Sequence, residues 1–322
     1  MALLEVEHLT IALWTAREGV AQVRDVSFAL PAGGTLGIVG ESGSGKSLTA
    51  LALMGLLPDA AQVSGRVRFE GQDVTRMPEA QLCALRGAAM AMVFQEPMTA
   101  LNPLHRIGDQ IAEPLRLHRG LGRAAAHAQA MALMQRVGLP DPLRRAKNYP
   151  HELSGGQRQR AMIAMALACG PKLLIADEPT TALDATTQAQ ILDLIAGLVA
   201  DAGMALLLVS HDLAVIAQNV AHVLVMYAGQ IVESGAVASV LAHPAHPYTR
   251  ALLAARPGLS GARLATIAGA APRPGDLPQG CSFAPRCGFS TAQCTAAPPG
   301  MVALGGGHLV RCIRPEARSA AA

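Results

Sequence analysis

The chain has 322 residues, enough for one large domain or two modest ones with a buried core. Hydrophobic residues make up 51% and aromatic residues 3% of it, and its formal net charge is +3. It has no basic tract of the kind that binds nucleic acid, no leader-like N-terminus, and no apolar run near the ~18–20 residues that span a bilayer. We therefore expect a cytosolic chain that reaches any membrane through partners.

The N-terminal part of the sequence predicts strands. Residues 3–30 alternate like antiparallel edge strands, and residues 31–34 have turn composition. A short buried strand is expected at 35–39, before a glycine-rich loop, and further strands at 65–70 and 90–94.

The middle of the sequence predicts first helices and then an alternation of strands and helices. Residues 104–168 have helical spacing, with breaks expected at Pro114, Pro140 and Pro150. Alternating elements imply a largely parallel sheet covered on both faces, so the fold class is α/β. The expected strands are 173–176, 205–210 and 223–227, and the expected helices are 187–200 and 213–219.

The composition changes after about residue 255. The tail is dense in Pro, Gly and Ala, and it holds four of the six cysteines. We therefore expect one large domain at 1–255, with a helical subdomain at about 96–168, and a small C-terminal extension at 256–322.

The segment Gly40–Ser47 matches in full the phosphate-loop pattern G-x-x-x-x-G-K-[ST]. Its glycines let the backbone turn N–H groups inward at a helix N-terminus, which forms a nest for phosphate. Lys46 can place its charge on the β- and γ-phosphates, and the Ser47 hydroxyl can ligate Mg²⁺. The loop predicts a triphosphate site, although kinases, GTPases and transport ATPases share it.

An acidic pair, Asp177 and Glu178, follows the apolar run 173–176. Ligands of open parallel sheets gather at the carboxyl ends of strands, so Asp177 can hold Mg²⁺ directly or through water. Glu178 points to a different side of the chain and is suited to accept a proton from an attacking water. A solvated turn is the plain alternative, but the strand before the pair and Pro179 after it favour function.

The segment Leu153–Gln157 reads Leu-Ser-Gly-Gly-Gln. Ser154 and Gln157 have the spacing of a capping box, which predicts a helix from about Gly155 to Ala168. Two glycines in its first turn each weaken the helix by roughly 1 kcal/mol relative to alanine, but they leave bare N–H groups open to an incoming phosphate.

Residues 3–235 resemble the nucleotide-binding subunits of ABC transporters. The resemblance implies a P-loop NTPase fold and makes the domain at 1–255 an ATP-binding domain. Gly40–Ser47 matches Walker A, Leu153–Gln157 the family signature, and Leu173–Glu178 Walker B with its catalytic glutamate. Six matching elements in the family's order make a chance match negligible. The other three are the Q-loop glutamine Gln95 in Val93–Pro97, the D-loop Ala182-Leu183-Asp184, and the switch histidine His211 in Val209–Asp212.

The resemblance implies that ATP lies between Walker A of one subunit and the signature of another. It implies that Glu178 polarises the attacking water, that His211 touches the γ-phosphate, and that Gln95 senses the membrane subunits. The implied Mg²⁺ ligands are Ser47, Gln95 and Asp177, and the implied D-loop residue is Asp184. Expected ATP contacts are Gly40, Glu41, Ser42, Gly43, Ser44, Gly45, Lys46, Ser47, Leu48 and Trp14, with Leu153, Ser154, Gly155, Gly156 and Gln157 contacting the ATP of the other subunit.

One element departs from the family pattern. The aromatic residue that stacks on adenine falls near Leu13, and Trp14 lies beside it. Trp14 is a candidate for the stacking, with a core or surface aromatic as an equal alternative.

The tail resembles dipeptide and oligopeptide importer subunits at residues 243–250 and around its four cysteines, spaced C-x5-C-x6-C-x17-C. Thiolates without nearby acidic ligands suit a [4Fe–4S] cluster or structural zinc, whereas disulfides need an oxidising compartment. We expect the cluster, with zinc or four unrelated thiols as alternatives and His308 as a possible replacement ligand. The cysteines are Cys281, Cys287, Cys294 and Cys312, while Cys83 and Cys169 are expected to be ordinary thiols.

The resemblance implies an ATP hydrolase that powers import of di- and oligopeptides from the cytoplasmic face of the inner membrane. Its implied partners are a homologous ATPase, two permeases and, indirectly, an extracytoplasmic binding protein, with no nucleic acid. Related subunits import nickel, glutathione or other small solutes, and the expected cargo rests on the family resemblance alone. A soluble ABC ATPase acting on ribosomes or DNA is disfavoured by the single phosphate loop, and a metal-sensing protein with a vestigial ATPase fold by the intact Lys46, Glu178 and His211.

Overall fold

The structure is a computed structural model that describes residues 2–14, 19–181, 183–255 and 267–315. The chain divides into two compact units, each assembled from separate segments of the sequence. Unit 1 comprises Met1–Leu3, Pro31–Gly34 and Arg76–Leu208, and unit 2 comprises Leu4–Leu30, Thr35–Thr75 and Val209–Ala322.

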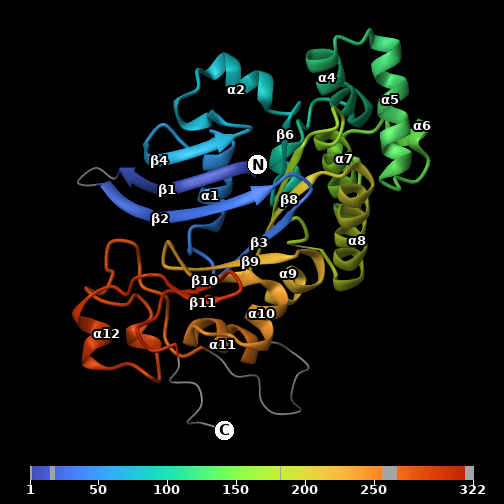
Figure 1. The fold of residues 1–322 in the computed structure, drawn as a ribbon. Helices are drawn as coiled ribbons and strands as arrows, with labels where there is room; N and C mark the ends of the chain where they lie inside the picture. The colour runs from blue at the N-terminus through green and yellow to red at the C-terminus, as the bar shows by residue number, and fades with distance from the viewer. Residues whose placement is uncertain (1, 15–18, 182, 256–266, 316–322) are drawn as a thin grey trace. The chain divides into compact units, whose positions relative to one another are not determined.

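Unit 2 contains an antiparallel sheet built by the N-terminal strands (Figure 1). Leu4 lies opposite Phe69 and Leu13 opposite Ala61, with an irregularity in register after Glu7. Alternate side chains are buried, which confirms the antiparallel strands expected at 3–30. The strand order is β2 (Gly19–Pro31), β1 (Ala2–Trp14), β4 (Ala61–Phe69) and β5 (Gln72–Asp73).

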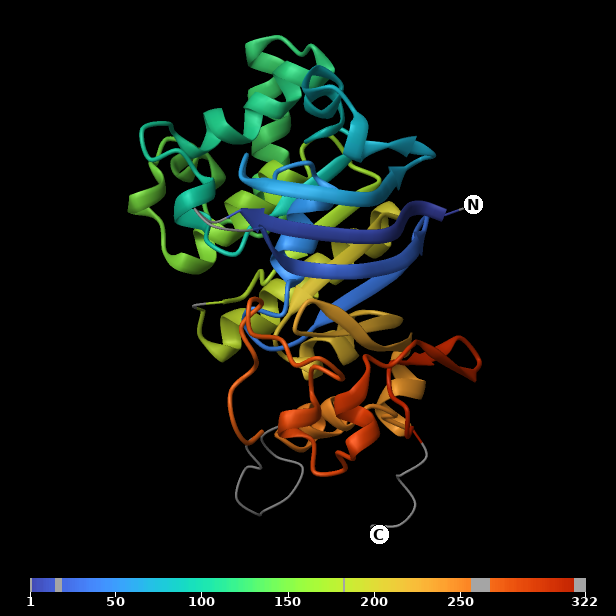
Figure 2. The same cartoon turned by 90° about the vertical axis from the view of Figure 1, so that its left-hand side faces the viewer.

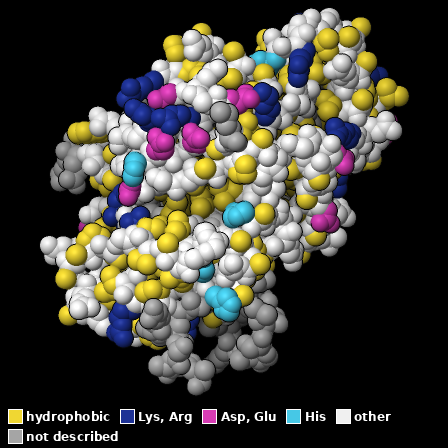
Figure 3. Space-filling model, viewed as in Figure 1, with side chains coloured by type: hydrophobic (Ala, Val, Ile, Leu, Met, Phe, Trp, Pro, Cys, Tyr) yellow, Lys and Arg dark blue, Asp and Glu magenta, His cyan; other side chains and the backbone are white. Residues whose placement is uncertain are grey.

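Charges of both signs lie intermixed over these N-terminal strands on the face that Figure 3 draws. Arg68 shows the pattern, because its guanidinium lies 2.9 Å from a carboxylate oxygen of Glu7 and 3.7 Å from one of Glu5. Exposed pairs of this kind contribute at most about 1 kcal/mol each.

The second set of strands in unit 2 positions the glycine-rich loop. β3 (Thr35–Val39) pairs in parallel with β9 (His222–Tyr227), and the loop follows β3 directly. Helix α1 (Lys46–Leu53) follows the loop, and α9 (Leu213–Asn219) packs on β3. The order continues antiparallel from β9 through β10 (Gln230–Ala236) and β12 (His308–Val310) to β11 (Val302–Gly305).

Unit 1 has buried strands of its own. β6 (Met90–Val93) and β7 (Leu173–Asp177) are parallel, with Val93 opposite Ala176, and every residue of both strands is buried. β8 (Ala205–Ser210) is the next strand in order, and its last two residues belong to unit 2. Strands buried on both faces, with helices between them in the chain, confirm the α/β prediction.

The helices of unit 1 pack around α7, which contacts α3, α4, α5, α8 and β6. The breaks expected at Pro140 and Pro150 are present, but the break expected at Pro114 is wrong because α4 continues through it. The proline removes one backbone hydrogen bond, and burial of Ile111 and Leu115 on either side offsets that loss. The helices are α2 (Glu79–Leu85), α3 (Pro97–Ala100), α4 (Ile107–Arg119), α5 (Arg123–Arg136), α6 (Pro142–Arg145), α7 (Gly155–Ala166) and α8 (Ala185–Ala202).

The C-terminal extension belongs to unit 2 and lies beside β9 and β10 in both views (Figures 1 and 2). Glu233 of β10 is fully buried, and its carboxylate accepts hydrogen bonds from the amides of Ala245 and His246 and pairs with His308 at 2.7 Å. A buried charge is stable only when its oxygens are satisfied, so this carboxylate ties the extension to the sheet. The remaining helices are η1 (Val74–Arg76), η2 (Pro150–Glu152), α10 (Val237–Ala242), α11 (Pro247–Ala254), η3 (Ala284–Arg286) and α12 (Ala292–Ala296).

No helix within the described ranges is long and apolar enough to cross a membrane.

Candidate functional site

The glycine-rich loop has the backbone geometry of an anion nest. Gly45 caps α1 in a left-handed conformation, with φ 97°, which a side chain would strain. At Gly40 a Cβ atom would overlap the carbonyl oxygen of Met226, so only glycine lets the loop approach β9. The structure thus gives a physical reason for glycine at both positions.

The side chains of this loop are arranged to receive phosphate. Lys46 is 4% exposed, and its Nζ donates to the carbonyl oxygens of Gly40 (2.9 Å) and Glu41 (3.1 Å). Ser44 is buried, and among the described residues its hydroxyl has no hydrogen-bond partner. A buried donor without a partner is costly, and a phosphate oxygen would satisfy it. Ser42 and Gly43 are exposed at the mouth of the loop.

Trp14 is the last residue of β1, and it is 52% exposed. This exposure excludes the alternative that Trp14 is an aromatic residue of the core. The indole packs next to Gly19, where a Cβ atom would lie 3.1 Å from the ring. Stacking of Trp14 on adenine stays a prediction.

His211 lies on the short turn between β8 and α9, and it is exposed. The Ser210 hydroxyl accepts a hydrogen bond from the Asp212 amide at 3.0 Å, and the Asp212 side chain caps α9 by accepting from the Ala214 amide at 2.7 Å. Both neighbours of the histidine are therefore fixed by hydrogen bonds, which holds the turn that carries it.

In unit 1 the acidic pair lies at the carboxyl end of β7. Asp177 is the last residue of the strand and is 5% exposed, while Glu178 adopts a left-handed backbone conformation with φ 44°. For a non-glycine residue that conformation costs about 1–3 kcal/mol and is concentrated at functional sites. The Thr181 hydroxyl donates to the Glu178 carboxylate at 3.0 Å, which helps to orient it.

Gln95 is exposed and follows β6. Because β6 and β7 are parallel neighbours, Gln95 and Asp177 lie at the same edge of the strand pair. The structure thereby brings together two of the three residues expected to hold Mg²⁺. The third, Ser47, belongs to unit 2.

The segment Leu153–Gln157 forms the predicted capping box at the start of α7. The Ser154 hydroxyl accepts from the Gln157 amide at 3.4 Å, and the Gln157 side chain accepts from the Ser154 amide at 3.3 Å. Ser154 and Gly155 are exposed, whereas Leu153 is buried and anchors the turn. The first turn of the helix therefore faces outward, as the sequence predicts.

The two glycines of this turn also have a packing role. A Cβ atom on Gly155 would lie 3.2 Å from Leu183, and one on Gly156 would lie 2.9 Å from the Thr187 methyl group. The glycines thus let α7 approach the segment that begins α8. No local pattern predicts this contact, which joins Gly155 and Gly156 to the segment 183–187 within unit 1.

Asp184 of the D-loop is the N-cap of α8. Its carboxylate accepts from the Thr187 amide at 2.9 Å and from the Thr187 hydroxyl at 2.7 Å, and these bonds lower the pKa of Asp184. Ala182, which the D-loop prediction also includes, lies outside the described residues.

The four tail cysteines line one cavity, together with side chains of α11 and Phe283. None of them forms a disulfide. Burial raises the pKa of Cys281, of Cys287 and of Cys312, and the neighbouring thiols raise each of them further. The Thr291 side chain instead lowers the pKa of Cys294.

This cavity is not arranged for a single metal ion: within the described ranges no three His, Cys, Asp or Glu side chains form a group that could hold one. Tetrahedral zinc with Zn–S bonds of about 2.3 Å needs its sulfurs roughly 4 Å apart. His308 pairs with the buried Glu233 carboxylate through Nε2 at 2.7 Å, and its role as a replacement ligand stays a prediction. Cys169 is buried and Cys83 exposed, as expected of ordinary thiols.

The α/β fold and the glycine-rich loop after β3 define a P-loop NTPase. Comparison with known proteins gives the family. The ABC transporter family matches residues 23–181, and the oligopeptide/dipeptide transporter C-terminal region matches residues 232–294. The chain belongs to the ABC transporter family, whose ATPases use ATP and Mg²⁺.

Its relatives include oligopeptide transport ATP-binding protein OppD of Salmonella typhimurium, which is 48% identical over 97% of this chain and 94% of its own. Dipeptide transport ATP-binding protein DppD of Escherichia coli is 45% identical over 98% of this chain and 97% of its own. Among solved structures, a dimeric structure of MJ0796, a bacterial ABC transporter cassette, has a TM-score of 0.65 and 26% identity. The aligned region covers 73% of this chain and 98% of that cassette.

Sequence reasoning missed two residues that contact the phosphate loop from the C-terminal side. The Tyr248 hydroxyl accepts a hydrogen bond from the Glu41 amide, and the Arg286 guanidinium pairs with the Glu41 carboxylate. Tyr248 lies in the segment that resembles peptide importers, and Arg286 directly precedes Cys287, so both were close to residues already singled out. Their contacts cross more than two hundred positions of the chain, which no local pattern reports.

Proposed function

We propose that this chain is the ATP-hydrolysing subunit that powers import of di- and oligopeptides across the inner membrane. The observation that carries the proposal is the similarity to OppD and DppD over nearly the whole chain, including the C-terminal region after the ATPase core. In this proposal the chain is peripheral on the cytoplasmic face, paired with a homologous ATPase and two permeases, and served by an extracytoplasmic binding protein.

In the proposed mechanism the phosphate loop binds the triphosphate. Lys46 would exchange its bonds to the loop carbonyls for phosphate oxygens, and the Ser44 hydroxyl would gain the partner that its burial requires. Ser47, Gln95 and Asp177 would hold Mg²⁺. The position of Gln95 and Asp177 at one edge of the β6–β7 pair supports this assignment.

The chemical step in this proposal is attack of water on the γ-phosphate. Glu178 accepts the proton of that water, oriented by its bond from Thr181, and His211 contacts the γ-phosphate. The first turn of α7 in a second ATPase supplies N–H groups to the same phosphate, so each site is shared by two subunits. The exposure of Ser154 and Gly155 supports a role toward a partner.

The tail is proposed to hold a [4Fe–4S] cluster on Cys281, Cys287, Cys294 and Cys312. What supports it is one cavity lined by the four thiols, none of which forms a disulfide. A cluster binds each thiolate at a different iron and so accepts wider spacing. When bound, the cluster would crosslink the segments of a tail that is rich in Pro and Gly, or it would accept an electron.

Uptake measurements test the function. In cells lacking this gene, import of a radiolabelled tripeptide should be lost, and it should return with the wild-type chain but not with the Lys46→Ala variant. Unchanged peptide uptake together with lost nickel or glutathione uptake would reassign the cargo. Unchanged uptake of all three solutes would overturn the importer assignment.

A further inference from the structure

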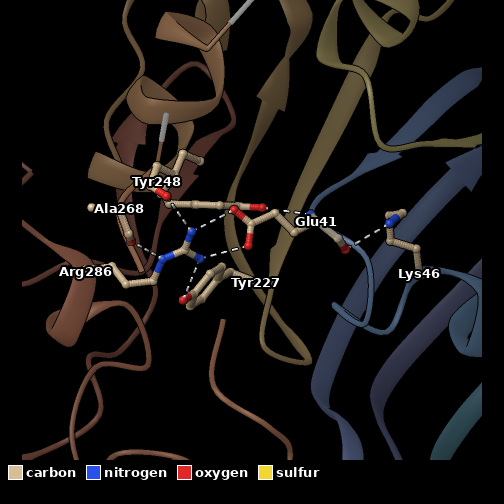
Figure 4. Close-up of polar contacts among 7 residues, drawn as sticks. Glu41, Lys46, Tyr227, Tyr248, Ala268 and Arg286 are labelled. Carbon is tan, nitrogen blue, oxygen red and sulfur yellow. Dashed lines mark hydrogen bonds and ion pairs between the residues drawn. The ribbon is translucent and has the colours of Figure 1, made fainter. Parts of the chain in front are cut away.

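A buried arginine of the C-terminal extension forms an ion pair with the phosphate loop. The side chain of Arg286 is 6% exposed, and its Nη1 and Nη2 atoms donate to the two carboxylate oxygens of Glu41 at 2.8 and 3.1 Å (Figure 4). Its other donors bond the carbonyl oxygens of Ala268 and Ile267 and the hydroxyl of Tyr227. Such a two-pronged arginine–carboxylate pair fixes geometry as well as charge.

Glu41 is held at two further points. Its amide donates to the Tyr248 hydroxyl at 2.8 Å, and its carbonyl accepts from Lys46 at 3.1 Å. Glu41 therefore connects α11, the turn that carries Arg286, and the lysine of the loop. Residues 41–44 and residues 271–274 of the extension line one cavity.

The charge of Glu41 gives this contact a consequence for the nucleotide. A carboxylate at the start of the phosphate loop repels a triphosphate, and Arg286 neutralises it. Burial lowers the pKa of Arg286, but the hydrogen bonds to Glu41 and Tyr227 and the charges of both groups together raise it by more, so the guanidinium stays charged.

We propose that Arg286 is a positioning residue for ATP: it fixes Glu41, and with it the first half of the phosphate loop, and cancels the charge of Glu41. The extension is then part of the ATP site rather than an appendage to it. This inference rests on the proposed assignment of Gly40–Ser47 to the triphosphate.

Equilibrium binding of a fluorescent ATP analogue to the full chain with Mg²⁺ tests the proposal. The Arg286→Ala variant should bind about ten-fold or more weakly, as expected for loss of a charged hydrogen-bonded pair. The double variant Glu41→Gln with Arg286→Ala should recover the part of that loss that comes from the uncompensated carboxylate, while the part that comes from the lost anchor remains. A purely structural role of the arginine predicts no such recovery.

Two further variants keep the test decisive. Arg68→Ala breaks the arginine pair with Glu7 in the same unit but far along the chain from the loop, and its affinity for the analogue should stay within about two-fold of wild type. Tyr248→Phe keeps the ring and removes only the acceptor of the Glu41 amide, so it should weaken binding several-fold even if Arg286→Ala does not fold.

The possible failures are distinguishable. Wild-type affinity in Arg286→Ala overturns the positioning role, and a loss that Glu41→Gln does not reduce at all overturns the charge cancellation. If Arg286→Ala does not fold, wild-type affinity in Tyr248→Phe overturns it instead. Retention of nucleotide binding in Lys46→Ala overturns the assignment of the loop itself.

Discussion

The hydroxyl of Thr181 donates a hydrogen bond to the carboxylate of Glu178 at 3.0 Å, from a position three residues further along the chain. Because Glu178 is also in a left-handed backbone conformation, both its main chain and its side chain are constrained. A proton acceptor held in this way needs little reorganisation before it acts on water.

Replacement of Glu178 by glutamine should abolish turnover while ATP binding persists. Loss of a general base lowers the rate about 10²–10⁴-fold, and the neutral amide still permits closure of the ATPase pair. Phosphate release and labelled ATP binding measure the two effects. Thr181→Val should slow turnover less, about ten-fold, and Thr181→Ser, which keeps the hydroxyl, is its control. Normal steady-state hydrolysis in Glu178→Gln would show that Glu178 is not the proton acceptor.

Substitution of Ser154 by arginine should separate the two sites of the ATPase pair. The bulky cation blocks the exposed first turn of α7, so hydrolysis at the partner's site should stop while this chain still binds its own ATP. Binding and single-turnover hydrolysis in the assembled pair measure this. Ala125→Arg places the same charge at an exposed position of α5 and should have no effect. Full turnover at both sites of the Ser154 variant would argue against a shared site.

Anaerobic purification should yield brown protein with about four iron atoms and matching sulfide per chain. Because burial raises the pKa of Cys281 and Cys287, these thiols stay protonated at neutral pH unless iron holds them as thiolates. Cys287→Ser should lower the iron content, and Cys83→Ser, which changes an exposed thiol on α2, should not. Stoichiometric zinc in place of iron would replace the cluster assignment.

Acid should destabilise the fold through His246. Burial lowers the pKa of this histidine from 6.5 to about 3, and its Nδ1 accepts the Tyr248 amide as the cap of α11. The folded protein therefore keeps it neutral, so its stabilisation is complete above pH 6.5 and declines as the pH falls toward 3. Between pH 8 and 5 the loss from this group amounts to about 2 kcal/mol.

The variant His246→Asn isolates this effect, since asparagine retains a capping oxygen and does not titrate. Thermal unfolding at pH 8 and pH 5 should show a smaller drop in Tm for the variant than for the wild-type chain. Equal drops in the two proteins would mean that other groups govern acid sensitivity.

Local patterns account for the parts of the site that the sequence predicted. The Ser154–Gln157 capping box lies within four residues, so propensity and spacing suffice to place it. The expected break at Pro114 failed because the same local rules ignore burial of Ile111 and Leu115 on α4, which a sequence shows only as apolar spacing.

Contacts between distant segments account for what the sequence did not predict. The pair between Glu41 and Arg286 spans 245 positions, and neither residue belongs to a periodic pattern. The approach of Gly156 to Thr187 is similar, because it depends on how two helices meet rather than on either helix alone.

The three bonds to the buried Glu233 carboxylate have a consequence for truncation. A chain ending before His308 would lose one of those partners and also β12, which covers the edge of β10. In the remaining protein the buried Glu233 carboxylate would lack one of its partners. The backbone donors and acceptors along the edge of β10 would also be unpaired, and such exposed edges pair with strands of other molecules. Shortened versions of this chain are therefore expected to aggregate before they lose ATP binding.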